Sequence, residues 1–581
     1  MNEAATDSST NTETRRFRWS VLLLLLAVGA GAWAVGGDRA RASARRLFLV
    51  NGGWDPLEVS VDGEPPLELR PGSVASMALA EGTHRARVEP HGAELSFALE
   101  GSFFERLADR TAFVLDPSGA ALLAFESEEY GPGQPQGHAP PPRLLFGEAF
   151  RRVSGVDHPF EDFPAQVSGH GETVVRTRLR LVPGPPGRAL AAFPPRDPAA
   201  LDYAERLLDP RREDEELLEA YLRRARALGQ LSAALAVLRG KLEPVAAAPE
   251  GRLNVVWHRA LHDLLRATGG DVAALRAAYR ERLQASPQDA GLHYMLGRTA
   301  TDPSEKRACY ERAVALDPEC SWAHFALAVH AARRGEYERA RPHARKAAAL
   351  RPHDEAMREF AFRVRFALGE YAALEAEARA RRTTAPLDLL TLRRHLEALV
   401  ALGRVAEARE AVQTYRQEVR ARSTGDPAQL ALHAELLLDD LLGEHARRAE
   451  RAAALRSERQ RSWILFQTLL ERGELAAAEK LLPSVGEPAA VVFLALARRR
   501  AGAGPEALAA DRARCAQALP QAAACFERPD LGALLALPLP DTTKAALLAL
   551  LDPGDPAFAE ARRRLARTTR YFPYRLLEGE G

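Results

Sequence analysis

The fold is decided by the stretch SWAHFALAVHAARRGEYERARPHARKAAALRP, residues 321–352. Its composition and periodicity are helical on both sides of Gly335. Glycine readily adopts the left-handed conformation that ends a helix. Pro352 then stops the second helix, because proline lacks the N–H group and clashes with the preceding turn. The stretch therefore predicts two consecutive helices joined by a tight turn.

This helical hairpin recurs along the chain. The residues that mark it are spaced 34 apart: Gly335, Gly369 and Gly403, Pro352 and Pro386, and Tyr337 and Tyr371. Trp257 and Gly270 repeat with the same internal spacing as Trp322 and Gly335. An unrelated helical bundle would explain the helices but not this period. A single hairpin cannot bury its apolar face, so we expect neighbouring hairpins to stack into a solenoid.

The stretch 321–352 resembles a tetratricopeptide repeat. Leu327-Ala328 occupy the Leu-Gly step of that family, and Ala340 and Ala347 stand where small residues let the helices approach. The preceding copy carries Leu296-Gly297. Weaker copies are centred on Gly229, Gly270, Gly369 and Gly403, and drifting ones on Gly443, Gly473 and Gly502. The resemblance implies a mainly α protein with a right-handed α-solenoid over 201–520, followed by capping helices and a tail over 521–581.

The resemblance also implies where a partner would bind. The first helix of each hairpin lines the concave surface of such arrays, and five residues take positions there: Trp322, Phe325, Val329, Arg363 and Arg393. Aromatic and arginine side chains are preferred anchors of protein interfaces. The alternative for Trp322 is packing between repeats. The Lys/Asn pattern with which some members hold a peptide carboxylate is not present in this sequence.

A β region precedes the helices. Leu57–Val61 alternates with period two before an Asp62-Gly63 turn signal, and further short apolar runs follow. We predict a small antiparallel β-sandwich over 47–126. A Pro/Gly linker over 127–143 should lead to a β segment over 144–183 that extends the first sheet or forms a satellite, and a Pro-rich linker over 184–200 should follow.

Part of this region resembles PEGA-type surface β modules. The resemblance lies in Val59–Gly63, Leu69–Gly72 and Leu79–His84, the last of which has the pattern of an "EG-x-H" hairpin. It covers about forty residues. It implies an adaptor or an envelope-associated module.

The N-terminal region predicts a membrane anchor. Residues 19–37 are uncharged and strongly apolar at their centre, and their length approaches the roughly 20 residues that cross a bilayer. Trp19 and Trp33 lie near the ends, where amphipathic rings favour the interface. We expect a single transmembrane helix after a disordered cytoplasmic tail over 1–18. A cleavable signal peptide is the alternative, because Ala32-Trp33-Ala34 resembles a cleavage site.

The orientation of the anchor is less constrained, because arginines flank it on both sides. The short polar tail favours an N-terminus inside the cytoplasm. We therefore expect a single-pass protein of a bacterial inner membrane with its body outside the cytoplasm.

The charge balance and the remaining motifs argue against several classes of function. The 79 Lys and Arg almost cancel the 78 Asp and Glu, whereas a nucleic-acid-binding protein normally carries a basic excess. His258 and His262 have the spacing of a zinc-binding pair, but Arg259 stands where the general-base Glu is expected. The acidic stretch Asp157–Asp162 contains a proline and is typical of a polar loop. Four cysteines match neither a redox nor a zinc pattern.

We therefore expect no catalytic, cofactor or metal site. The sequence predicts a membrane-anchored scaffold that binds a partner protein or peptide through the solenoid and is also able to self-associate. The alternative is an envelope glycan- or polymer-binding protein that acts through its β domain, with the repeats as a spacer or oligomerisation surface.

Overall fold

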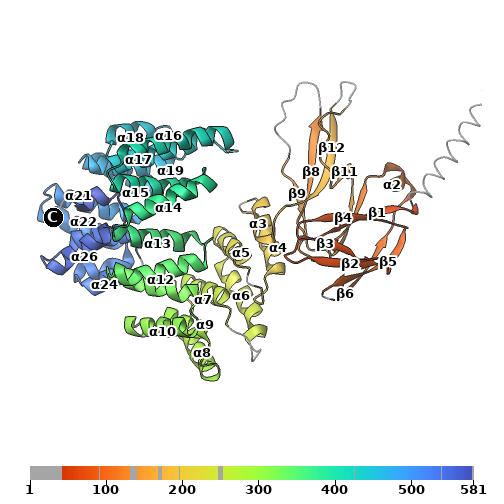
Figure 1. Cartoon of the computed structure of the whole chain (residues 1–581), viewed down its shortest axis with the longest axis horizontal. Helices are drawn as coiled ribbons and strands as arrows, with labels where there is room; N and C mark the ends of the chain where they lie inside the picture. The colour runs from red at the N-terminus through yellow and green to blue at the C-terminus, as the bar shows by residue number, and fades with distance from the viewer. Residues whose placement is uncertain are drawn as a thin grey trace, which may run out of the picture. The chain divides into compact units, whose positions relative to one another are not determined.

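The computed structural model describes residues 42–90, 92–130, 140–167, 173–194, 196–212, 214–246, 253–423, 425–537 and 539–578. The predicted membrane span at 19–37 lies outside these residues. Within them, no helix combines the length and the apolar character that crossing a membrane requires. The chain divides into two compact units, Met1–Leu275 and Arg276–Gly581, and each is described by itself (Figure 1).

The described strands of the first unit form three four-stranded sheets. Sheet A has the order β10 (Phe150–Ser154), β7 (Thr111–Leu115), β1 (Arg45–Val50), β4 (Val74–Leu79). Sheet B has the order β3 (Leu67–Leu69), β2 (Leu57–Val61), β5 (Gly82–Glu89), β6 (Ala93–Leu99). Sheet C has the order β11 (His158–Pro159), β12 (Val174–Leu181), β8 (Leu123–Tyr130), β9 (Arg143–Leu145). The predicted β segment over 144–183 thus supplies β10 to sheet A and β11 and β12 to sheet C.

The central strands β1 and β7 of sheet A are buried on both faces. Leu47 and Leu49 of β1 pack into one core with sheet B, whereas Phe48 and Val50 pack into a second core with Leu179 of sheet C. The prediction of one antiparallel sandwich is therefore wrong in two respects: there are three described layers, and β1 pairs with β7 in parallel. Strands buried on both faces carry continuous apolar runs, so alternation could not reveal them.

A histidine–aspartate contact joins the segments Val59–Gly63 and Leu79–His84. Asp62 and Gly63 form the turn after β2 with φ values of 52° and 81°. His84 Nδ1 lies 2.6 Å from Asp62 Oδ2, and its Nε2 lies 2.8 Å from the carbonyl of Ala80. The hydrogen bond with His84 lowers the pKa of Asp62. The contact holds the turn after β2 against β5.

The stretch predicted as a linker over 184–200 is instead packed structure. It contains α3 (Pro186–Ala189) and a short 3-10 turn, and Leu190 and Phe193 are 2% and 3% exposed. Both side chains share a core with Leu122 next to β8 and with α4 (Ala199–Leu207), α5 (Glu215–Ala227), α6 (Leu231–Ala246) and α7 (Val255–Ala267). Proline is well tolerated in a first helical turn, so the Pro-rich composition did not exclude packing. A boundary at 200/201 would divide this core.

The second unit consists of helical hairpins, stacked side by side in Figure 1. Helix α8 (Val272–Ala285) contains the boundary between the units. The hairpins are α9 (Ala290–Thr299) with α10 (Pro303–Leu316), α11 (Ser321–Ala332) with α12 (Tyr337–Leu350), α13 (Glu355–Ala367) with α14 (Tyr371–Thr384), α15 (Leu389–Ala401) with α16 (Val405–Arg422), α17 (Pro427–Leu442) with α18 (His445–Ala452), α19 (Glu458–Glu471) with α20 (Leu475–Val485), and α21 (Pro488–Arg500) with α22 (Pro505–Ala518). Five further helices follow: α23 (Ala523–Glu527), α24 (Leu531–Ala536), α25 (Asp541–Leu551), α26 (Pro556–Ala566) and α27 (Tyr574–Glu578).

The predicted turn glycines have the expected conformation. Gly335, Gly369 and Gly403 have φ values of 73°, 77° and 75°, and the drifting copies also turn on left-handed glycines. Near Gly270 the left-handed residue is its neighbour Gly269. The helix–turn–helix repeat is therefore confirmed, including copies that depart from the 34-residue period.

Two glycines in helices should respond oppositely to alanine. A Cβ atom on Gly297 of α9 would lie 2.6 Å from the ring of Tyr310, whereas one on Gly240 of α6 would meet open space. We expect Gly297→Ala to lower the free energy of unfolding by about 1–3 kcal/mol and Gly240→Ala to raise it by about 0.5–1 kcal/mol. Urea titration of both variants measures this, and a change of the same sign in both would contradict it.

Candidate functional site: the first-helix surface

The first helices of successive hairpins, α11, α13, α15, α17, α19 and α21, contribute to one surface, which we call the first-helix surface. Residues at equivalent positions pair across its repeats. The Arg393 guanidinium bonds Glu359, 34 residues earlier. Arg363 Nη1 lies 2.6 Å from Oε2 of Glu397, also 34 residues away. The sequence period therefore reappears as a ladder of ion pairs between α13 and α15.

The five predicted partner-binding residues fall into two groups. Trp322, Phe325 and Val329 of α11 are partly buried. The Phe325 ring packs edge-to-face on Phe360 of α13 with centroids 5.3 Å apart, and the Arg351 guanidinium lies 4.6 Å from the Trp322 ring. The rings of Trp322 and Phe325 therefore already make contacts within the array of repeats. Arg363 and Arg393 instead contact Thr568 and Tyr571 near the C-terminus. A role in partner binding stays a prediction for all five.

The first-helix surface is covered by the C-terminal segment, residues 567–577. The contacts of this segment follow the order of the repeats: it meets α13, then α15, α17, α19 and finally α21. Just before it, the carbonyl of Arg564 in α26 accepts a 3.2 Å hydrogen bond from Tyr337 of α12. The segment thus crosses the first helices one after another.

The first half of the segment is held through its backbone and hydroxyl groups. Arg363 Nη1 donates to the carbonyl of Thr568 at 3.1 Å. Glu397, which is fully buried, accepts from the Thr569 hydroxyl at 2.7 Å and from the Arg570 N–H at 2.6 Å. The Tyr571 hydroxyl donates to the carbonyl of Arg393 at 2.9 Å. Two backbone groups and two hydroxyl groups of the segment make these contacts.

The second half is held by acidic side chains. Asp440 of α17 accepts from the Phe572 N–H at 3.2 Å and pairs with Arg575 at 3.0 Å. Glu471 of α19 pairs with the same guanidinium at 2.9 Å. Arg500 of α21 closes the series by donating to the Leu576 carbonyl at 2.7 Å. One arginine of the segment is therefore fixed by two carboxylates from neighbouring repeats.

The prediction that residues 521–581 form capping helices and a tail needs correction. Helix α25 does pack on α21 and is buried over most of its length. Residues 567–577, however, lie on the first-helix surface and not at the end of the array. Tyr571, Phe572 and Arg575 find apolar and acidic partners there. The dense Arg and aromatic composition of 567–575 was the sequence signal for this segment, which repeat analysis overlooks.

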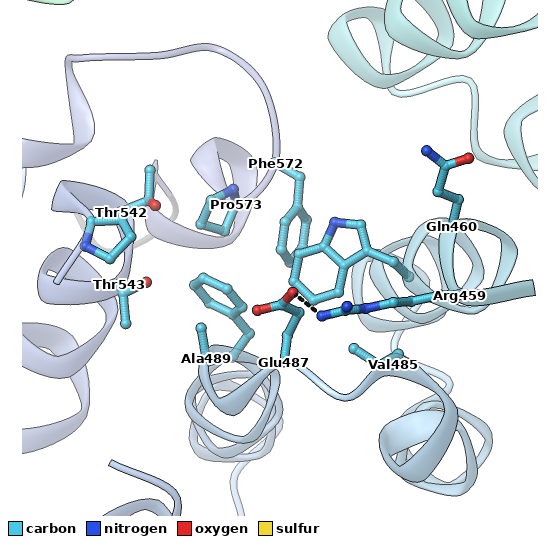
Figure 2. A pocket seen from close by; sticks show the side chains of 12 residues that line it. Arg459, Gln460, Val485, Glu487, Ala489, Thr542, Thr543, Phe572 and Pro573 are labelled. Carbon is cyan, nitrogen blue, oxygen red and sulfur yellow. Dashed lines mark hydrogen bonds and ion pairs between the residues drawn. The ribbon is translucent and has the colours of Figure 1, made fainter. Parts of the chain in front are cut away.

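A pocket of about 430 Å³ adjoins the segment (Figure 2). Phe572 projects into it from the segment, Thr542 and Thr543 border it on the opposite side, and Trp463 and Phe493 complete its apolar lining. Arg459 and Glu487 form a 2.6 Å ion pair at this pocket. A second pocket of about 310 Å³ shares Phe572 and Thr542. Two pockets on the first-helix surface thus share Phe572 in their lining.

Charge pairing sets the ionisation of this surface. Burial by itself raises the pKa of the Glu359 carboxyl, but the guanidiniums of Arg363, Arg393 and Arg394 outweigh it and lower the pKa to about 2. At Glu471 burial dominates and raises the pKa despite Arg575. Burial also raises the pKa of the Tyr571 hydroxyl. Glu359 is therefore charged throughout the neutral range, as its three arginines require.

The lowered pKa of Glu359 predicts acid sensitivity. In the unfolded chain this carboxyl titrates near 4.5, so its ion pairs stabilise the fold above that pH, and the stabilisation is lost as the pH falls towards 2. Between about pH 5 and about pH 3 we expect the unmodified chain to lose about 2 kcal/mol more stability than Glu359→Gln. Urea midpoints at the two pH values measure it. Parallel losses in both proteins would contradict the assignment.

The residues that could have suggested a metal site, an acid–base site or a redox site take the following places in the structure. His258 and His262 are buried in α7 at 8% and 3% exposure. Asp157 accepts a 2.9 Å hydrogen bond from the Thr177 N–H and pairs with Arg110 at 2.7 Å. The four cysteines are free thiols. Among the described residues, no group of three or more His, Cys, Asp or Glu could hold a metal ion.

No protein-family model matches the sequence, and no curated protein matches it significantly. Solved structures that are similar in part include the following two. A tetratricopeptide repeat protein from Parabacteroides merdae ATCC 43184 is 14% identical, covering 47% of this chain and 98% of its own, with a TM-score of 0.27. The APC/C hetero-tetramer Cut9-Hcn1 is 10% identical, covering 63% of this chain and 92% of its own, with a TM-score of 0.16. TM-scores this low do not establish a shared overall fold, so the tetratricopeptide-like repeat is assigned from the geometry of the hairpins.

Proposed function

We propose that this protein is a membrane-anchored scaffold that binds a short segment of a partner protein on its first-helix surface. The observation that carries the proposal is the occupied state of that surface. The C-terminal segment lies across five successive first helices and is bonded at each of them. A surface that holds one short segment in this way has the groups needed to hold another of similar chemistry.

The chemistry of the bound segment defines the partner. Glu397 satisfies backbone N–H and hydroxyl donors, while Asp440 and Glu471 fix an arginine. The Phe572 ring packs edge-to-face against Trp463 and Phe493 at the pocket. We therefore propose a partner segment that places an arginine three residues after an aromatic residue, as Phe572 and Arg575 do.

Affinity capture with competition tests this function. The tagged full chain is captured from native membranes in mild detergent, with and without an excess of a peptide of residues 566–578. We expect the peptide to displace the co-captured partner, while a scrambled peptide of equal composition does not. Capture that is insensitive to the peptide would overturn the proposal. Co-pelleting with cell-wall material, again insensitive to the peptide, would favour the glycan-binding alternative.

The anchoring is part of the same proposal and rests on the apolar stretch 19–37. We propose that it spans a bacterial inner membrane with the body outside the cytoplasm. Protease added to intact spheroplasts should then digest the body. If the body is digested only after lysis, the protein has the opposite orientation.

A further inference from the structure

Helix α2 (Phe103–Ala108) exposes a concentrated apolar surface. Phe104 is 77% exposed, Leu107 44% and Phe103 37%, and no residue of the helix is buried. These three, which we call the α2 patch, make up half of the six large hydrophobic side chains that are exposed among the described residues. Single exposed apolar residues are ordinary, whereas a cluster marks an interaction site.

The patch is held rigidly. The Ser102 hydroxyl accepts from the Glu105 N–H, and the Glu105 carboxylate accepts from the Ser102 N–H at 2.8 Å, which forms a complete capping box. Asp109 ends the helix in the left-handed conformation. Glu105 also pairs with Arg152 of β10. The exposed rings therefore belong to a helix that is fixed at both ends.

One glutamate places α2 beside the start of the described chain. The Glu81 N–H donates to the carbonyl of Ala42 at 2.7 Å, while its Oε2 accepts from Arg106 of α2 at 2.8 Å. Figure 1 shows α2 next to β1. Only five residue steps separate Ala42 from Gly37, the end of the predicted span, and such a length reaches at most about 18 Å. The patch is therefore confined to the neighbourhood of the membrane surface if 19–37 is anchored there.

We propose that the α2 patch inserts into the interfacial region of the lipid bilayer and forms a second contact of the first unit with the membrane. The proposal rests on the membrane anchoring proposed above. Phenylalanine and leucine on one short helix are suited to the boundary between headgroups and acyl chains. The anchor already confines the patch to the neighbourhood of the membrane. Its insertion therefore needs only a small additional gain in binding free energy.

Photo-cross-linking in the full chain tests the insertion. The photoreactive p-benzoyl-phenylalanine replaces Phe104, the protein is reconstituted into phosphatidylcholine–phosphatidylglycerol vesicles, and lipid adducts are identified by mass spectrometry after irradiation. Val74 is the control position, chosen as an exposed apolar residue away from α2. It is 37% exposed, as Phe103 is, but it pairs with Val50 at the end of β1 opposite to Arg45. We expect at least about tenfold more lipid adduct from position 104 than from position 74.

Alkaline carbonate extraction of the same vesicles separates the two proposals. A chain that resists extraction but forms no lipid adduct at position 104 overturns the α2 proposal and leaves the anchor intact. A chain that is extracted yet forms the adduct overturns the anchor and retains the patch as a surface contact. Adducts from position 104 to protein in native membranes, with no lipid adduct, overturn the proposal in favour of a protein partner.

Discussion

Replacing both Tyr571 and Arg575 with alanine should let a peptide of residues 566–578 bind the full chain about a hundredfold more tightly than it binds the unmodified protein. In the unmodified protein the C-terminal segment competes as an intramolecular ligand, whose effective concentration is in the millimolar range. Tyr571 is 8% exposed, and Arg575 bridges Asp440 and Glu471. Removing both side chains weakens the attached segment while the receiving helices stay unchanged.

Fluorescence anisotropy of the labelled peptide measures this effect. A peptide that carries the same two alanines serves as the control and should bind neither protein. Circular dichroism should show that the helices of the variant are retained. Equal affinities of the unmodified chain and the variant for the native peptide would mean that the segment is a fixed part of the fold and does not occlude a binding surface.

Glu397→Ala should lower the free energy of unfolding by about 3–5 kcal/mol. The carboxylate is fully buried and holds three groups: the guanidinium of Arg363, the hydroxyl of Thr569 and the N–H of Arg570. Without it, two partly buried donors lose their acceptor and Arg363 retains Glu359 as its remaining carboxylate. The loss should therefore combine a weakened ion pair with a detached segment.

Urea titration of the full chain in detergent measures this loss, with Glu407→Ala as the matched control. Glu407 pairs with Arg404 three residues away, and its side chain is 50% exposed. Exposed pairs of this kind are worth about 0–1 kcal/mol, so the control should unfold nearly as the unmodified chain does. Glu397→Gln, which keeps one acceptor oxygen, should fall between them. If Glu397→Ala and Glu407→Ala lower the free energy of unfolding by similar amounts, Glu397 does not hold Arg363 and the C-terminal segment in the way described.

The repeat was predictable from sequence because its signals are local. Gly335, Gly369 and Gly403 mark turns that need a left-handed residue, and the structure has that conformation at each. The same period indicated which residues share a surface, since Glu359 and Arg393 are equivalent and pair directly. Residues that repeat at a fixed spacing can be recognised in the sequence even when the other positions of the copies diverge.

The remaining features depend on contacts between distant segments. Nothing in 184–200 reveals that Phe193 packs in a core with Leu122, because the composition of the stretch is that of a linker. The position of the C-terminal segment is likewise set by side chains more than a hundred residues away, such as Asp440. The exposed rings of α2 gave no periodic signal, because the helix has six residues.

The central place of β1 has a mechanical consequence. This strand is the first of the described chain, and it is bonded along one edge to β4 through six register pairs and along the other to β7 through three. A pull on the chain at Ala42 therefore loads both edges of an interior strand in shear, and its hydrogen bonds have to yield together. An edge strand would instead peel away one bond at a time. The interior position of β1 should therefore make the first unit more resistant to such a pull than an edge strand would.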